Sequence, residues 1–429
     1  MAKKLSNHKP WFRFAPAANP HGEGARAENA VTMAQRFALA ALAFGVSLFA
    51  ARSSASQIGI TIGVLPPGPG DAITDVAGVR VAHVTKIEGS PGALVPGKGP
   101  VRTGVTVVLP NDDPWTKRVA ASTYDLNGNG EMTGAHWVDE SGFLEVPIAL
   151  TNTLDVGRVD DGVIDWLIAK HPDIGVDDDV PLPVVAECDD QGINDIQGRH
   201  VMPSDVVAAL DAAKGGTFER GDVGAGTGMR AFAFKAGIGT ASRVIAKDHG
   251  GYTVGVLVNA NTGSRAELRI DGVPVGRVLA NELLPSVAKH AAMRTRGRAA
   301  DGSVIVTIAT DAPLDSRQLH ELAIRATLGL ARTGITSHVS SGDLLIAFST
   351  THLYPRDPNS PLPATLVNDD DTMDALFAAT AEATEAAVDD ALFSAHTMSG
   401  ARGLTYYAIP LTEVRKLLNT AKDSLPSKR

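Results

Sequence analysis

The chain has 429 residues, of which 44% are apolar and 20% charged, with 43 glycines and 25 prolines. This composition is typical of a globular protein with about two or three domains' worth of mass, and it excludes disordered, collagenous and coiled-coil classes. A single cysteine excludes an internal disulfide framework and cysteine-clustered metal sites, and the net charge of −9 argues against nucleic acid as the main partner.

The first 55 residues differ from the rest of the chain. They carry a net charge of +5, against −14 for the remainder, and an apolar run of 15 residues, 37–51, follows Arg36. A basic flank, a short apolar segment and small residues at the cleavage site are typical of a secretory signal. A membrane-spanning helix needs about 20 apolar residues, so this run is short for one. We therefore predict that residues 1–55 are a signal extension of a periplasmic or secreted protein. The alternatives are a buried or interfacial helix in this segment and a cytoplasmic protein.

Downstream of this extension, short β-branched runs bounded by glycine, proline or aspartate predict strands. Most runs are continuously apolar rather than alternating, which is typical of strands covered on both faces. The predicted strands are 104–109, 146–151, 184–187, 252–259, 303–310 and 344–350.

Three helices are predicted among and after these strands. Residues 158–170 carry an apolar stripe, and residues 371–392 are rich in alanine. Between them, Asp315 is expected to cap a helix with Gln318 as its capping-box partner, and Gly334 is expected to end that helix. Strands and helices in this mixture predict a layered α/β or α+β domain.

The junction at Ser303 is the most informative place in the chain. Residues 292–302 are basic and rich in small residues without an apolar period, which predicts an exposed loop leading into the strand that begins at Ser303. A strained Gly302–Ser303 peptide can be attacked by its own hydroxyl, and the product is an N-terminal serine, which is one form of activated nucleophile. On this pattern alone, a serine that merely starts a strand remains the commoner interpretation.

Several segments favour the nucleophile interpretation of Ser303. In them the sequence resembles the L-aminopeptidase/D-amidase/D-esterase (DmpA) family, which includes the β-aminopeptidases. The similar segments follow the family's order at 75–83, 128–134, 140–142, 151–153, 187–195, 224–229, 234–242, 301–314 and 340–350. The resemblance covers about residues 58–410. It implies an α+β fold, a four-layer αββα sandwich like that of N-terminal-nucleophile hydrolases but with different connectivity. It also implies a self-processing serine hydrolase that acts on peptides, amides or esters with a free amino group.

The resemblance also implies roles for individual residues. The chain would cut itself after Gly302, and Ser303 would become the catalytic nucleophile. Ser341 and Asp343 would complete the catalytic group: Ser341 would orient Ser303 or relay its proton, and Asp343 would hold Ser341 in place. The family enzyme carries glutamate at the last position, so Asp343 is one methylene shorter and its geometry has to be tested.

Three further positions take roles from the resemblance: Asn261 as a catalytic residue, and Glu187 and Asp189 as the expected substrate-binding residues. Asn261 matches an amide that donates to the oxyanion of the tetrahedral intermediate, and Glu187 matches a carboxylate that holds the substrate's amino group. Asp189 stands where the characterised enzyme has a tyrosine, so the preference among L-, D- and β-residues stays open.

Self-cleavage would divide the catalytic domain into a large chain, 56–302, and a small chain, 303–429. The resemblance implies a homo-oligomer, a tetramer of two-chain protomers, with no cofactor and no metal. A small peptide or amide is the expected partner, with no nucleic acid and no stable membrane partner once the signal is removed. The rival interpretations are a non-catalytic periplasmic binding protein for amino compounds and a hydrolase of another bond, such as a lactam or lactone.

Two other features favour structural roles. Residues 125–130 match the first half of a calcium loop, but His136 stands where the loop needs glutamate, so a glycine-rich wall of the active site is the preferred interpretation. His338 lies three residues before Ser341 and is the histidine nearest to the proposed chemistry. No metal-ligand spacing accompanies it, and a structural role is favoured.

Overall fold

The computed structural model of the chain describes residues 59–287, 302–356, 359, 361, 363–365 and 370–424. The predicted signal extension, 1–55, lies outside the described residues, and so does the predicted loop at 292–302 except for its last residue, Gly302.

Two mixed sheets form the centre of the fold. The first contains, in spatial order, β1 (Arg80–Glu88), β2 (Val101–Leu109), β5 (Ile148–Thr151) and β6 (Val184–Glu187). The second contains β14 (Tyr354–Pro355), β3 (Lys117–Gly128), β13 (Gly342–Ser349), β12 (Ser303–Thr310), β10 (Thr253–Asn261) and β9 (Ile238–Val244), with β4 (Phe143–Leu144) beside β3. The β5–β6 and β12–β13 pairs are parallel and the other pairs of these sheets antiparallel.

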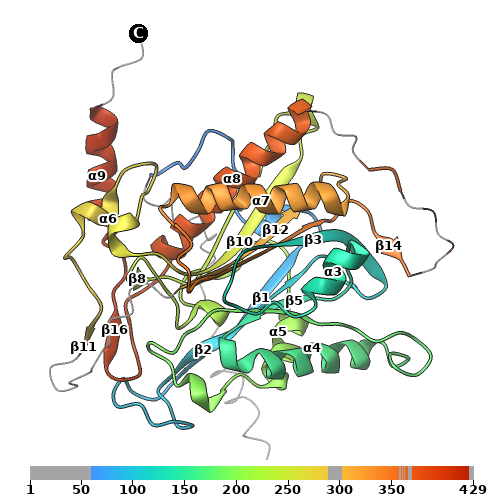
Figure 1. Ribbon diagram of the computed structural model, residues 1–429, viewed down its shortest axis with the longest axis horizontal. Helices are drawn as coiled ribbons and strands as arrows, with labels where there is room; N and C mark the ends of the chain where they lie inside the picture. Colours follow the sequence, from blue (N-terminus) through green and yellow to red (C-terminus); the bar gives the residue numbers. More distant parts are fainter. Residues whose placement is uncertain are drawn as a thin grey trace, which may run out of the picture. The chain divides into compact units, whose positions relative to one another are not determined.

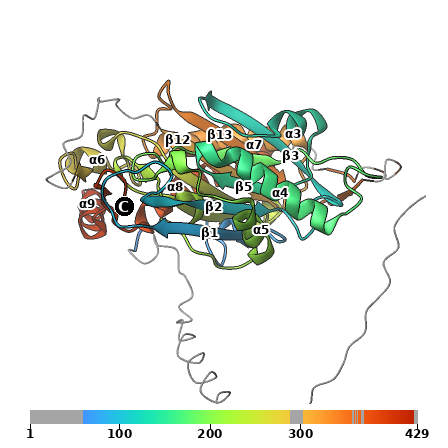
Figure 2. The same cartoon turned by 90° about the horizontal axis from the view of Figure 1, so that it is seen from below.

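Helices cover the outer face of each sheet (Figures 1 and 2). The first sheet packs against α4 (Val156–Lys170) and α5 (Pro203–Ala212), and the second packs against α7 (Ser316–Arg332) and α8 (Asp370–Phe393). The four layers confirm the αββα sandwich that the resemblance implied. The shorter elements are α3 (Ala135–Ser141), α6 (Val275–Val278), α9 (Leu411–Asp423), β7 (Arg230–Ala231), β8 (Phe234–Lys235), β11 (Ser286–Val287), β15 (Met398–Ser399) and β16 (Leu404–Tyr406).

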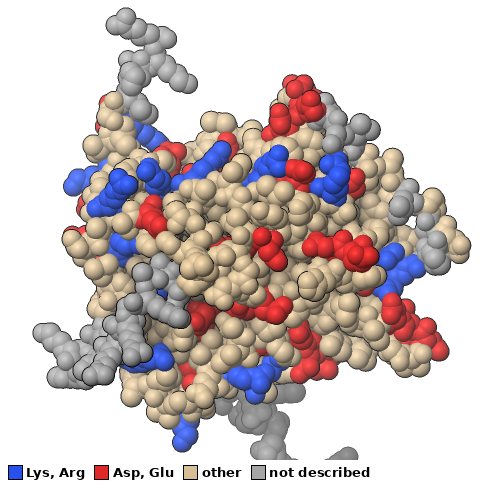
Figure 3. All heavy atoms as spheres, in the orientation of Figure 1, with Lys and Arg blue, Asp and Glu red and all other residues tan. Residues whose placement is uncertain are grey.

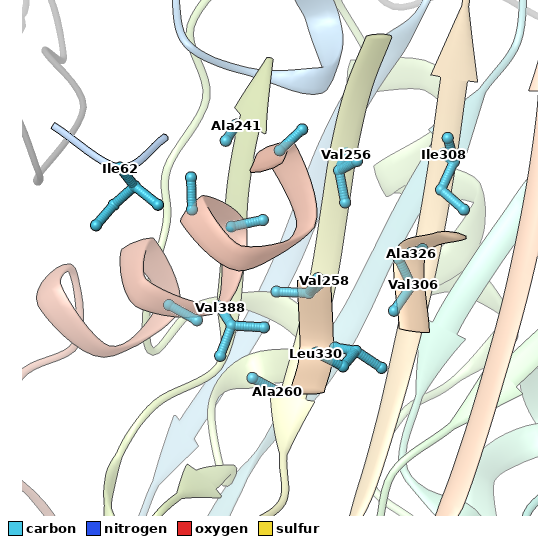
Figure 4. Close-up of a cluster of buried hydrophobic side chains, with 14 of the residues drawn as sticks. Ile62, Ala241, Val256, Val258, Ala260, Val306, Ile308, Ala326, Leu330 and Val388 are labelled. Atoms are coloured by element: carbon cyan, nitrogen blue, oxygen red, sulfur yellow. The ribbon is translucent and has the colours of Figure 1, made fainter. Parts of the chain in front are cut away.

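Strand β12 shows why the central strands are continuously apolar. All its residues are buried. Val306 and Ile308 pack toward α7 and α8, as Figure 4 shows, whereas Ile305 and Ala309 belong to the core shared with the first sheet. A strand covered on both faces has no exposed position for a polar residue, which confirms the interpretation of these runs.

The predicted caps of α7 are confirmed. The backbone N–H of Gln318 donates to Asp315 Oδ1 at 2.8 Å, and the backbone N–H of Asp315 donates to Gln318 Oε1 at 3.1 Å. Gly334, which follows the helix, has a φ of 98°, a backbone conformation that favours glycine. These local signals set the ends of the helix that covers β12 and β13.

The described residues include no helix that is both long enough and apolar enough to cross a membrane. On the face shown in Figure 3, acidic and basic side chains are interspersed. The net negative charge of the chain is therefore not gathered into one patch on that face.

Phe348 provides a test of the core between the two sheets. Its side chain is fully buried near the end of β13, and replacing it with alanine is expected to lower the free energy of unfolding by about 3–5 kcal/mol. Leu328 of α7 is 55% exposed, and its replacement with alanine is the matched control. Denaturant unfolding of both variants checks the expectation; equal stabilities would contradict the assignment of Phe348 to the core.

Candidate active site

The ends of four neighbouring strands meet at one edge of the second sheet. Strand β10 ends at Asn261, which lies opposite Ser303, the first residue of β12. Strand β13 begins at Gly342, which lies beside Ser303 on one side and opposite Gly128, the last residue of β3, on the other. The strand register thus brings together residues that are far apart in the sequence, including Ser341, which precedes Gly342.

Asn261 presents its amide to Ser303. Its Nδ2 lies 3.4 Å from Ser303 Oγ and donates to the carbonyl oxygen of Asp189 at 2.9 Å. The backbone N–H of Arg230 donates to the Asn261 Oδ1 at 3.2 Å, which fixes the orientation of the amide. An N–H donor held in this way beside a buried hydroxyl is suited to stabilise negative charge that develops when the hydroxyl attacks a carbonyl.

Ser341 and Asp343 form a buried pair on either side of Gly342, the residue that pairs with Ser303. Ser341 Oγ donates to Asp343 Oδ1 at 2.6 Å, so the shorter aspartate still reaches the serine. Burial raises the pKa of Asp343, while hydrogen bonds from Ser337 and Ser341 and the charge of His338 act in the opposite direction. Because Ser341 directs its own proton to Asp343, its oxygen can accept a proton from another hydroxyl.

Gly302 lies closely against the end of β10. Its carbonyl oxygen accepts from the backbone N–H of Gly342 at 3.1 Å. A Cβ atom at position 302 would lie 2.8 Å from the Cα of Thr262 and 2.9 Å from the carbonyl oxygen of Asn261, so only glycine fits here. The carbonyl carbon next to Ser303 is therefore held in place and polarised by a main-chain donor.

Glu187 ends β6 and faces the same edge from the first sheet. Its carboxylate accepts from the Thr153 hydroxyl and, at 3.3 Å, from the backbone N–H of Glu131. A Cβ atom at Gly130 would lie 3.4 Å from Glu187 Oε1 and 3.4 Å from the Cα of Gly342. Gly130 therefore lies between Glu187 of the first sheet and Gly342 of the second. Burial raises the pKa of Glu187, and the carboxylates of Asp189 and Glu131 raise it further. A buried carboxylate in acidic surroundings is suited to bind an ammonium group.

Asp189 holds the Asn261 amide through its main chain. Its carbonyl oxygen holds Asn261, whereas its exposed carboxylate accepts from Gln191 through the backbone N–H at 2.8 Å and Nε2 at 2.6 Å. Asp189 has no phenolic hydroxyl, so it cannot donate a hydrogen bond as a tyrosine at this position could. Cys188, next to it, is fully buried, and burial raises the pKa of its thiol well above the ordinary value.

This geometry agrees with the comparisons with known proteins. The family model for peptidase family S58 matches residues 71–406. The chain belongs to peptidase family S58. It is 45% identical to the β-peptidyl aminopeptidase BapA of Sphingosinicella xenopeptidilytica over 355 residues, which cover 82% of this chain and 88% of that protein. These matches show that the protein is a hydrolase related to aminopeptidases.

Solved structures confirm the S58 fold. The PH0078 protein of Pyrococcus horikoshii OT3 is 43% identical with a TM-score of 0.79, over 86% of this chain and 99% of the other. The L-aminopeptidase D-Ala-esterase/amidase of Ochrobactrum anthropi, described as a variant of the Ntn-hydrolase fold, is 36% identical with a TM-score of 0.75, over the same shares. The α+β sandwich is thus shown by both the layers and the relatives.

The structure shows contacts in this S58 site for residues to which no individual role was assigned from the sequence, including Asn129 of the segment 125–130 that was expected to form a wall of the site. They are Thr153 and Glu131, which bind the Glu187 carboxylate, Gly342, which donates to the Gly302 carbonyl, and Asn129, whose backbone N–H donates to the Ser341 carbonyl at 3.3 Å. The resemblance covered 128–134 and 151–153 but assigned no role there. The contacts of Thr153, Gly342 and Asn129 follow from strand pairing within a sheet, whereas the Glu131–Glu187 contact joins the segment after β3 to the end of β6.

Proposed function

We propose that this S58 chain cuts itself between Gly302 and Ser303, and that Ser303 then removes the N-terminal residue from peptides, amides or esters with a free amino group. The observation that supports this most is the position of Ser303. It begins a buried strand between the Asn261 amide and the Gly342 N–H, and the latter already donates to the carbonyl that would be attacked.

The self-cleavage step needs only groups that the site contains and one water molecule. Ser303 Oγ attacks the carbonyl carbon of Gly302, the Oγ–C bond forms, and the C–N bond breaks as the nitrogen takes a proton. This step leaves a free α-amine on Ser303 and an ester between Gly302 and Ser303 Oγ. Water then cleaves the ester, which releases the Gly302 carboxylate and restores the Ser303 hydroxyl. The products are a large chain, 56–302, and a small chain, 303–429, which has 127 residues.

In turnover, Ser303 Oγ attacks the carbonyl of the substrate's first residue. Its proton passes to Ser341 or to the new α-amine, with Asp343 orienting Ser341, and the Asn261 amide donates to the developing oxyanion. The leaving amine or alcohol departs with a proton and leaves an acyl ester on Ser303. Water hydrolyses this ester and restores the enzyme.

Glu187 binds the ammonium group of the substrate in this proposal, so Glu187→Gln is expected to raise KM about 10–100-fold with a smaller effect on kcat, because a charge-assisted contact is lost. The carboxylate must be ionised to bind the ammonium, and its pKa is raised. The wild-type KM should therefore rise as pH falls through that raised pKa, whereas the KM of the variant should not change there. Steady-state kinetics across pH check this; a KM equal to that of the wild type would refute the assignment.

The substrate class follows from what the named relatives act on. One is a β-peptidyl aminopeptidase and another is an L-aminopeptidase and D-Ala-esterase/amidase. We expect aminoacyl p-nitroanilides, amides and esters with a free amine to be cleaved, and their N-acetylated forms to be resistant. An uncut chain that binds amino compounds without turnover would support a binding protein instead, and cleavage confined to lactams or lactones would support the other rival.

Export and assembly belong to the same proposal. A signal extension at residues 1–55 would direct the protein to the periplasm or outside the cell, where the two-chain protomers would associate as a homotetramer. Fractionation of expressing cells tests the first point and light scattering of the purified protein tests the second. A cytoplasmic protein, or a monomer, would refute the corresponding point without affecting the chemistry of Ser303.

A further inference from the structure

Glu267 connects the two sides of the active site. It closes the short turn Arg265–Glu267, which follows Asn261 by only a few residues. On its other side lies the segment 336–341, which leads into Ser341 and Asp343. The proposed function uses neither Glu267 nor this connection.

The turn that carries Glu267 is held firmly. The buried guanidinium of Arg265 donates to the carbonyl oxygens of Phe232 at 2.8 Å and Ala233 at 2.8 Å and lies 3.3 Å from the centre of the Phe234 ring. The backbone N–H of Ser264 donates to Glu267 Oε2 at 2.8 Å. The Glu267 carboxylate therefore has a fixed position relative to Asn261.

The same carboxylate holds the segment before Ser341. The Thr336 hydroxyl donates to Glu267 Oε1 at 3.0 Å, and His338 Nε2 lies 3.3 Å from the carboxylate oxygens. The carbonyl oxygen of His338 in turn accepts from the backbone N–H of Ser341 at 2.7 Å and from Asn127 Nδ2 at 2.5 Å. A displacement of the His338 main chain would therefore also displace Ser341, which is hydrogen-bonded to it.

The ionised state of Glu267 is supported by its neighbours. Although burial opposes it, hydrogen bonds from Ser264, His338 and Thr336 lower the pKa of Glu267. The side chains of His338 and Glu267 are 39% and 24% exposed, and an ion pair with this much exposure contributes little to stability. Its effect is therefore expected on geometry rather than on folding.

We infer that Glu267 is a positioning residue of the reaction: through Thr336 and His338 it holds Ser341 and Asp343 in register with Ser303 and Asn261. This inference rests on the proposed function. After the proposed cut, Glu267 and Asn261 belong to the large chain, whereas Thr336, His338 and Ser341 belong to the small chain. The Glu267 bridge, defined as its contacts with Thr336 and His338, then joins the two chains beside the nucleophile.

Four proteins test the bridge: wild type, Glu267→Ala, Glu267→Gln and, as a control, Glu321→Gln, which removes a comparably exposed charge paired with Arg325 on α7. The kcat is expressed per cleaved protomer, counted from the small-chain band. We expect Glu267→Ala to lower kcat about 10–100-fold with an unchanged KM and melting temperature, because small displacements of reacting groups have effects of this size. Glu267→Gln keeps an acceptor oxygen and should restore most of kcat, and Glu321→Gln should match the wild type.

A double-mutant cycle separates this role from a purely structural one. If the bridge acts as a unit, Glu267→Ala combined with His338→Ala should be no slower than Glu267→Ala alone. A wild-type kcat for Glu267→Ala, or a parallel fall of kcat and melting temperature that Glu267→Gln does not relieve, would overturn the inference. A wild-type protein that neither cuts itself nor turns over substrate would instead refute the proposed function.

Discussion

Replacing Ser303 with alanine is expected to leave one uncut chain and to lower turnover about 10⁶-fold, the size of the loss when a serine hydrolase loses its nucleophile. The reason is that the same hydroxyl makes both attacks, first on the Gly302 carbonyl and then on the substrate. Ser303 is the residue that pairs with both Asn261 and Gly342 in the strand register.

Gel electrophoresis and p-nitroanilide hydrolysis measure both effects of this substitution. Ser303→Cys retains a nucleophile and is expected to show partial cleavage, while Ser424→Ala, at the exposed end of α9, should behave as the wild type. A Ser303→Ala protein that still splits and turns over would show that the nucleophile is misassigned.

Removing the Asn261 side chain with Asn261→Ala is expected to lower kcat/KM about 100–1000-fold, because a preorganised N–H donor is lost from the oxyanion. Self-cleavage should be affected less, since the Gly302 carbonyl already accepts from the Gly342 N–H at 3.1 Å. The two reactions would thus differ in their dependence on one amide.

The control for this prediction is Asn111→Ala. Asn111 is also buried and donates through Nδ2 to the Lys117 carbonyl, but Lys117 starts β3 whereas the site lies at that strand's other end. Its loss should alter stability and leave kcat unchanged. Steady-state kinetics of both variants decide the matter: an unchanged rate for Asn261→Ala would remove its role.

The central strands were predictable because burial on both faces leaves a strong signal. The bounds predicted for β6 and β12 agree with the structure residue for residue, and those of β10 and β13 differ by two residues or fewer at each end. Strands β1, β3 and β9 were not predicted. In β9 the reason is that its segment, IGTASRV, is rich in small and polar residues. These residues are needed for packing: a Cβ atom at Gly239 would lie 2.0 Å from the carbonyl oxygen of Ala387 in α8.

The site itself depended on contacts that no local pattern encodes. Asn261, Ser303 and Gly342 meet because β10, β12 and β13 pair in one register. The resemblance supplied candidate roles for Ser303, Ser341, Asp343, Asn261 and Glu187, and the structure brings all five to the junction of the two sheets. Glu267 belongs to no motif, and Thr153 belongs to one that assigned it no role, since each acts through a side chain that belongs to another element.

N-terminal sequencing of the polypeptides in purified wild-type protein tests the central claim most directly. The account predicts a small chain that begins with serine at position 303 and has the mass of residues 303–429, together with a large chain ending at Gly302. A fully active preparation that contains only an uncut chain, or a small fragment that begins at another residue, would contradict it.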